Sequence, residues 1–190
     1  MKALVFGHSQ SGGMGLDLVA ALKKREWQVV RSTHNGFSDY KLLNFIPDLG
    51  DLSQIDRTYL FAGANNPHPT PETILKMVKL LGGAERVTVI LPPYNEAKES
   101  PTVMADQTTK GWVNSQALKA AGVPVYRVLA PAKEFSDGIH LRRGSATSKE
   151  LAEQIVGGQS QIGQAVTGAV GVGAVVGVAF LLWFVFRGLR

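Results

Sequence analysis

Five short apolar runs, separated by segments of helical character, constrain the fold of this chain more than any other feature. The runs cover residues 2–6, 27–32, 57–63, 86–93 and 123–129. Helices are predicted between and after them, over residues 15–25, 39–46, 71–81, 103–121 and 147–157. Short apolar strands that alternate with helices form a parallel sheet covered on both faces. We therefore predict an α/β three-layer sandwich around a mostly parallel five-stranded sheet.

Composition narrows the range of partners. The chain has 190 residues, enough for one domain with a proper core and a short appendage. It has no cysteine, which excludes disulfides, a thiolate nucleophile and cysteine-bound metal. The net charge is +5, but the basic residues are scattered, so we expect no nucleic-acid partner.

The segment from residue 165 to residue 186 differs from the rest, because its 22 residues carry no charge. As a helix it would be about 33 Å long, and a bilayer core is about 30 Å thick. Trp183 and Arg187 stand where interfacial anchors occur. We predict a folded domain over residues 1–157, a linker over 158–164, a transmembrane helix over 165–186 and a basic tail over 187–190.

Small residues recur at every fourth position of this apolar segment. They are Ala165, Ala169, Gly173 and Gly177. Such a stripe lets membrane helices approach closely, so a homo-oligomer is expected through it.

Membrane topology has two interpretations. Arg187 and Arg190 favour a cytoplasmic C-terminus with the domain outside, yet the start "MKALVFGHS" lacks the long apolar region of a signal peptide. Either the protein is tail-anchored with its domain in the cytoplasm, or it arrives by another route, such as a phage virion that delivers it to the host envelope. Both interpretations predict a membrane protein with a single C-terminal span.

The loops that follow the strands are rich in chemically active groups, and in parallel sheets ligands bind at that edge. The loop after residue 6, "GHSQSGGMG", has no lysine for a Walker motif and the wrong glycine spacing for a dinucleotide fingerprint. The four histidines of the chain, at positions 8, 34, 68 and 140, have no metal-binding spacing. We expect His8, His34 and His68 to be solvent-exposed loop residues. We expect neither a cofactor nor a metal.

Serine catalysis remains. Ser9 follows the first strand, and Ser11 is expected to cap the next helix. Asp137 and His140 are three residues apart after the last strand, so one tight turn can join the carboxylate to the imidazole.

These residues resemble the SGNH (GDSL-like) hydrolases over roughly residues 1–155. The matching elements, in order, are Gly7-His8-Ser9, Gly36, Gly63-Ala64-Asn65-Asn66 and Asp137-Gly-Ile-His140. The second is the least distinctive, since the amide of Ser38 or Asp39 could replace that of Gly36. The resemblance implies the flavodoxin-like SGNH fold.

The resemblance also implies a membrane-anchored serine esterase or deacetylase that acts on acyl or acetyl esters of a small molecule or glycan, including cell-envelope polymers. Ser9 would be the nucleophile, His140 the base, and Asp137 the residue that orients His140. The oxyanion would be bound by the amides of Ser9 and Gly36 and by the side chain of Asn65.

Two positions depart from the family pattern. His8 and Asn66 each replace an aspartate. The alternative is therefore an inactive SGNH-like phage virion or membrane-associated structural protein, whose glycine-rich helix oligomerises in a membrane.

Overall fold

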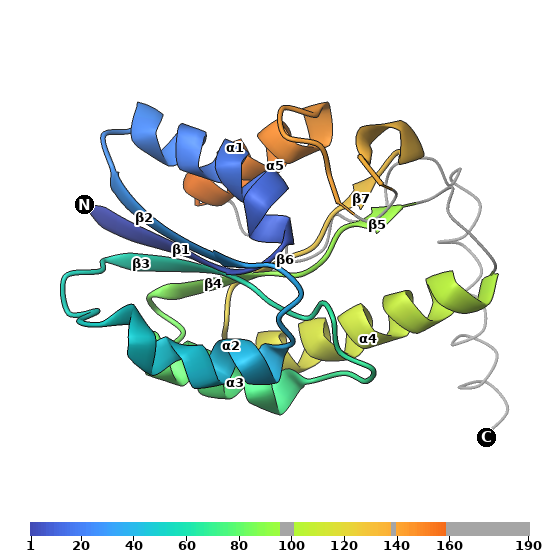
Figure 1. Cartoon of the computed structure of the whole chain (residues 1–190), viewed down its shortest axis with the longest axis horizontal. Coiled ribbons are helices and arrows are strands. Elements are labelled where there is room, and N and C mark those ends of the chain that lie inside the picture. Colours follow the sequence, from blue (N-terminus) through green and yellow to red (C-terminus); the bar gives the residue numbers. More distant parts are fainter. Residues whose placement is uncertain (96–100, 138–139, 159–190) are drawn as a thin grey trace, which may run out of the picture.

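In the computed structural model, residues 1–95, 101–137 and 140–158 are described. The main sheet is parallel throughout, with the strand order β2-β1-β3-β4-β6 (Figure 1). Its strands are β1 (Lys2–His8), β2 (Gln28–His34), β3 (Arg57–Phe61), β4 (Val87–Ile90) and β6 (Val125–Tyr126). The predicted five-stranded parallel sheet is confirmed, and all five strands have their carboxyl ends at one edge.

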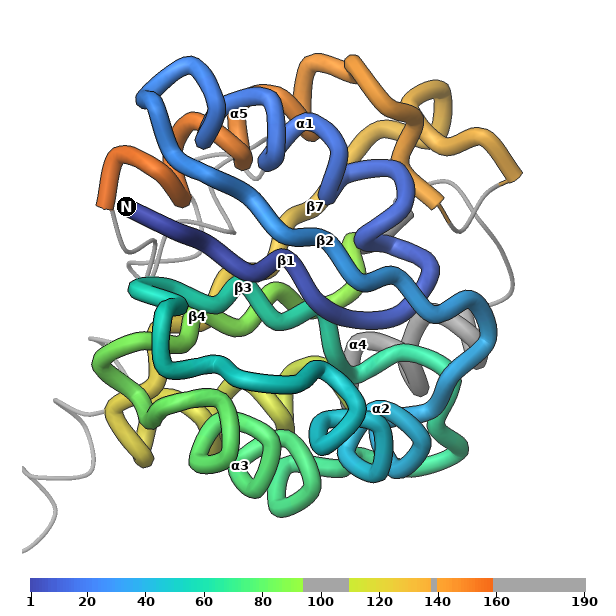
Figure 2. Tube along the Cα trace, turned by 60° about the vertical axis from the view of Figure 1, so that its left-hand side comes forward, coloured from blue at the N-terminus to red at the C-terminus, as the bar shows by residue number. Residues whose placement is uncertain are grey.

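Helices cover both faces of the sheet, as predicted (Figures 1 and 2). One face carries α1 (Gln10–Lys24) and α5 (Ala146–Val156), which pack against each other. The other carries α2 (Asp39–Phe45), α3 (Pro71–Leu80) and α4 (Pro101–Ala120). The result is a three-layer α/β sandwich.

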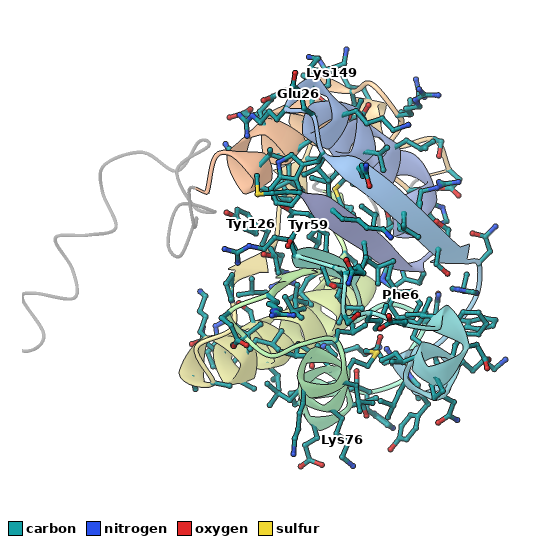
Figure 3. All side chains as sticks on the ribbon, turned by 90° about the vertical axis from the view of Figure 1, so that its left-hand side faces the viewer. Phe6, Glu26, Tyr59, Lys76, Tyr126 and Lys149 are labelled. Carbon is teal, nitrogen blue, oxygen red and sulfur yellow. The ribbon has the colours of Figure 1, made fainter. Side chains whose placement is uncertain are left out.

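Strand β1 lies inside the sheet between β2 and β3, which explains why its residues 3–6 are all apolar. Side chains alternate across a strand, so Leu4 and Phe6 enter the core beneath α2 and α3, while Ala3 and Val5 enter the core beneath α1 and α5. Figure 3 shows the two sides, with Phe6 towards α2 and the two labelled tyrosines on the opposite side.

A second, smaller sheet was not predicted. It consists of β5 (Tyr94–Asn95) and β7 (Leu129–Ala130), which pair in parallel. The predicted strand over 86–93 ends early because Pro92 and Pro93 have no N–H group to donate to a neighbouring strand. Two short 3₁₀ turns, Ile46–Leu49 and Ala132–Glu134, complete the described elements.

Helix α1 begins at Gln10, five residues earlier than predicted, so three glycines lie inside it. Glycine is an unfavourable helix residue, but here its small size allows close packing. A Cβ on Gly15 would stand 3.5 Å from both the Phe61 ring and the Val5 side chain. Close contact with the sheet therefore outweighs the local helix propensity.

The predictions about the C-terminal region concern residues outside the described part of the chain. These are the transmembrane helix over 165–186, the tail over 187–190 and, apart from Gly158, the linker over 158–164. Within the described residues, no helix has the length and apolarity required to cross a membrane. The span and the oligomer through its small residues stay predictions.

Candidate active site

Asp137 and His140 lie together before α5, as the sequence predicts. The Ser136 N–H donates to the His140 carbonyl at 2.8 Å, and an antiparallel bridge joins Phe135 to Leu141. The backbone N–H of His140 donates to Oδ1 of Asp137 at 2.8 Å. This bond therefore fixes one carboxylate oxygen and directs the other towards the imidazole.

Ser9, His140 and Asp137 form a continuous chain of hydrogen bonds. Nδ1 of His140 lies 2.6 Å from Oδ2 of Asp137, and Nε2 lies 2.7 Å from Oγ of Ser9. With a proton on Nδ1 donated to the carboxylate, Nε2 is the acceptor for the serine hydroxyl. The His140 and Asp137 side chains are 33% and 52% exposed, so solvent reaches them directly.

The position of Ser9 suits a nucleophile. Ser9 is the N-cap residue of α1, but its side chain makes no capping hydrogen bond, and its hydroxyl faces His140 instead. The positive end of the helix dipole lies at the same place, and it stabilises negative charge that develops near the serine.

A hydrogen bond joins the loop of Asn65 to the loop of Gly36, and these two loops hold predicted oxyanion donors. Asn65 has a positive φ of 57°, and its Nδ2 donates to the Phe37 carbonyl at 3.1 Å. This bond leaves the second hydrogen of the amide for another acceptor. Gly36, with a φ of 72°, directly precedes Phe37 and is exposed. The amide of Asp39 is already engaged, because it donates to Oδ1 of Asn66 at 3.1 Å. In this loop, the backbone amides of Gly36 and Ser38 therefore remain as candidate donors to an oxyanion.

A buried carboxylate, which the sequence analysis missed, stands behind these loops. Asp39 is fully buried and accepts from the Gly63 N–H at 2.9 Å, from Nδ2 of Asn66 at 2.9 Å and from Oγ1 of Thr70. Burial raises the pKa of Asp39, and the three donors act in the opposite direction. Asn66, one of the two departures from the family pattern, is therefore the reciprocal partner of Asp39.

The other departure, His8, is also buried. Its Nδ1 accepts from the Gln10 N–H at 3.3 Å, and its Nε2 has no hydrogen-bond partner among the described residues. The pKa of His8 is lowered to about 4, mainly by burial; the Ala62 carbonyl raises it, and repulsion from His140 contributes to the lowering. His8 is thus neutral at pH 7, and the expectation of an exposed loop histidine was wrong for it.

Acid should destabilise the protein through His8. Its pKa falls from 6.5 in the unfolded chain to about 4 in the folded one, so the unfolded state takes up the proton first as the pH drops. The contribution of His8 to the free energy of unfolding is fully present above pH 6.5. Between pH 6.5 and 4 about 3 kcal/mol of it is lost.

Urea unfolding of the wild type and of His8→Gln at several pH values measures this effect. Other titrating groups cancel in the difference between the two proteins, which should shift by about 3 kcal/mol in favour of the variant from pH 7 to 4. Parallel stability curves would contradict the assignment.

Two further sequence expectations need correction. Ser11 does not cap α1; it lies inside the helix, where its Oγ donates to the His8 carbonyl at 2.8 Å and lies 2.9 Å from Oγ1 of Thr33. His34 is half-buried, with Nε2 2.7 Å from Oγ of Ser32 and its ring between Phe37 and Phe45. No group of three or more metal-ligating side chains occurs in the part of the chain that the structure describes.

No protein-family model and no curated protein matches this sequence. Solved structures do, and they show that the chain has an SGNH-like (GDSL-like) hydrolase fold. A lipase/acylhydrolase from Enterococcus faecalis is 20% identical, with a TM-score of 0.61 over 83% of this chain and 94% of that one. A catalytic mutant of an acetylxylan esterase from Geobacillus stearothermophilus is 15% identical, with a TM-score of 0.63 over 85% and 94% of the two chains. A family 3 carbohydrate esterase from Clostridium thermocellum is 16% identical, with a TM-score of 0.54 over 80% and 91%.

Proposed function

We propose that this protein is a serine hydrolase that cleaves acyl or acetyl esters. The observation that carries the proposal is the pair of short contacts that joins Ser9 to His140 at 2.7 Å and His140 to Asp137 at 2.6 Å. This geometry favours an active enzyme over an inactive structural protein of the same fold. The two departures also fit activity, because His8 and Asn66 are bonded to backbone and side-chain groups outside the triad.

In the proposed reaction, Oγ of Ser9 attacks the carbonyl carbon of the ester while its proton passes to Nε2 of His140. The bond from the carbonyl carbon to the alcohol oxygen then breaks, and that oxygen takes the proton from Nε2. Water next attacks the acyl group on Ser9 and gives its proton to Nε2. The acid leaves as Oγ recovers that proton. Asp137 holds Nδ1–H throughout and stabilises the imidazolium.

The negative charge on the carbonyl oxygen needs donors that are already in place. We assign the backbone amides of Ser9 and Gly36 and the side-chain amide of Asn65 to this role. Ser9 lies at the N-terminus of α1, and Asn65 is fixed to the loop of Gly36 through the Phe37 carbonyl. One such donor is typically worth about 10²–10³ in rate.

The substrate is proposed to be an ester on a small molecule or a glycan. Two of the solved structures described above are an acetylxylan esterase and a carbohydrate esterase, which favours an acetylated glycan. The exposed His140 and Asp137 agree with a substrate that docks from outside. Acetyl groups on cell-envelope polymers are one such class.

Replacing the nucleophile tests the proposal. The full chain, in mild detergent, should hydrolyse p-nitrophenyl acetate or an acetylated xylan, and Ser9→Ala should lower kcat by at least about 10⁴-fold, since no other group can form the acyl-enzyme. A fluorophosphonate probe should label the wild type but not Ser9→Ala. The matched control is Ser53→Ala, an exposed serine far along the chain, which should retain activity. Equal turnover with and without Ser9, or neither turnover nor labelling, would refute the proposal.

A further inference from the structure

Helix α1 holds more of the site than its nucleophile. Gly13 and Asp17 follow Ser9 at intervals of four residues, so the three share one face of the helix. Both contact residues that come soon after His140: Gly13 meets Leu141, and Asp17 meets Gly144 and Ser148. The helix that begins at the nucleophile is therefore also the support for the segment that carries the base.

The contact at Gly13 is a direct approach of two backbones. A Cβ on Gly13 would lie 2.6 Å from the carbonyl oxygen of Leu141, much closer than a carbon atom and an oxygen atom can approach. Leu141 is the residue next to His140 and is itself buried. Glycine at position 13 thus lets the segment that carries His140 lie against α1.

The contact at Asp17 is a pair of hydrogen bonds. Asp17 is 9% exposed, and its Oδ2 accepts from the Gly144 N–H at 2.7 Å and from Oγ of Ser148 at 2.6 Å. Among the described residues no lysine or arginine pairs with this carboxylate, so neutral donors alone satisfy the oxygen. Burial of an unpaired carboxylate costs several kcal/mol. The anchoring of a surface loop alone would not justify placing one here.

Other bonds order the segment without attaching it to α1. The Arg142 N–H donates to the Glu134 carbonyl at 2.8 Å, and the Thr147 N–H donates to Oε2 of Glu134 at 2.9 Å. The Ser148 N–H donates to Oγ of Ser145 at 3.2 Å and so caps α5. The hydrogen bonds of Asp17 differ because they join this segment to the helix of the nucleophile.

We propose that Asp17 is a positioning residue that sets the distance between Ser9 and His140 by holding residues 144–148 against α1. This inference rests on the proposed hydrolase function for its kinetic consequence, but not for its structural one. A displacement of about 1 Å between reacting groups can cost about 10²-fold in rate. Loss of the Asp17 bonds should therefore lower kcat by about 10- to 100-fold and leave KM almost unchanged.

The test compares Asp17→Ala with Asp17→Asn in the full chain. Asparagine retains an oxygen that can accept both bonds, so Asp17→Asn should keep kcat close to that of the wild type. Asp48→Ala removes an exposed carboxylate elsewhere and is the matched control. Proton NMR gives a second readout, because the Nδ1–H proton shared by His140 and Asp137 should resonate far downfield. The resonance is assigned by its absence in His140→Gln. This resonance should weaken or vanish in Asp17→Ala and persist in Asp17→Asn.

Gly13→Ala keeps the inference testable if Asp17→Ala fails to fold. Alanine favours the helix by about 1 kcal/mol over glycine, yet its Cβ must displace the Leu141 carbonyl. It should therefore reduce kcat and the downfield resonance in a protein that still folds.

The outcomes separate the two proposals. A folded Asp17→Ala or Gly13→Ala protein with wild-type kcat and resonance overturns the positioning role, as does an Asp17→Asn variant impaired as severely as Asp17→Ala. If no ester is hydrolysed by any of the proteins while the resonance responds as expected, the positioning role stands and the proposed activity fails.

Discussion

Asp137→Asn is expected to lower kcat by about 10⁴-fold while the protein stays folded. From the residues that the structure describes, this side chain receives a bond from the His140 backbone N–H and shares another with Nδ1 of the His140 ring. An asparagine has one oxygen for these two donors. If the oxygen meets the backbone N–H, the amide NH₂ faces Nδ1 and forces the proton onto Nε2, where the base can no longer accept from Ser9. If the amide turns over, two N–H groups oppose each other.

Steady-state kinetics on a p-nitrophenyl ester, together with the Asp48→Asn variant as an exposed carboxylate control, measure this effect. Residues that act as a unit are not additive, so Ser9→Ala combined with Asp137→Asn should be no slower than Ser9→Ala alone. An Asp137→Asn enzyme within tenfold of the wild type would show that His140 does not depend on Asp137.

Asn66→Asp is expected to disable the protein, although aspartate is the residue that the SGNH hydrolases, which this chain resembles, have at the matching position. Asn66 donates from Nδ2 to the Asp39 carboxylate at 2.9 Å and accepts from the Asp39 backbone N–H at 3.1 Å. A second carboxylate would replace that donor with an acceptor and oppose two negative charges in a buried place. We expect a loss of about 3 kcal/mol in the free energy of unfolding.

The same change should lower kcat by about 10²–10³-fold, because Asn65, the proposed oxyanion donor, is the adjacent residue. Burial already raises the pKa of Asp39, and a second carboxylate raises it further, so the Asn66→Asp protein should recover stability as the pH falls and the pair takes up a proton. Asn44→Asp, on the exposed side of α2, is the matched control. A stable, active Asn66→Asp enzyme would mean that the bonds between Asp39 and Asn66 are dispensable.

Most of the fold was predictable because it depends on burial. The alternation of apolar strands and helices identified all five strands of the main sheet, and residues 3–6 of β1 are apolar because the two faces of the strand enter two cores. The β5 and β7 strands were missed because they lie at the ends of the runs over 86–93 and 123–129, so no separate pattern distinguishes them from β4 and β6. The early start of α1 was missed because three glycines argue locally against a helix, while their contacts with distant strands favour it.

The candidate site, like the fold, was predictable only in part. The contacts among Ser9, Asp137 and His140 were predictable, because strand ends and a spacing of three residues are local features of the sequence. Asp39 and Asp17 were not, because each acts on residues far along the chain. The bond from Asp39 to Gly63 spans 24 positions, and that from Asp17 to Ser148 spans 131. Nothing in the neighbourhood of either aspartate distinguishes it from an ordinary surface carboxylate.

The wide separation of Ser9 from His140 along the chain would also govern when the proposed nucleophile becomes reactive during synthesis. Ser9 leaves the ribosome among the first residues, but His140 lies 131 positions later, and its segment is held in place only when α5 packs against α1. During translation the growing chain therefore carries an ordinary, unactivated hydroxyl. Under the proposed function, reactivity would appear only after His140 and α5 have emerged, so chains truncated before this point would not hydrolyse esters.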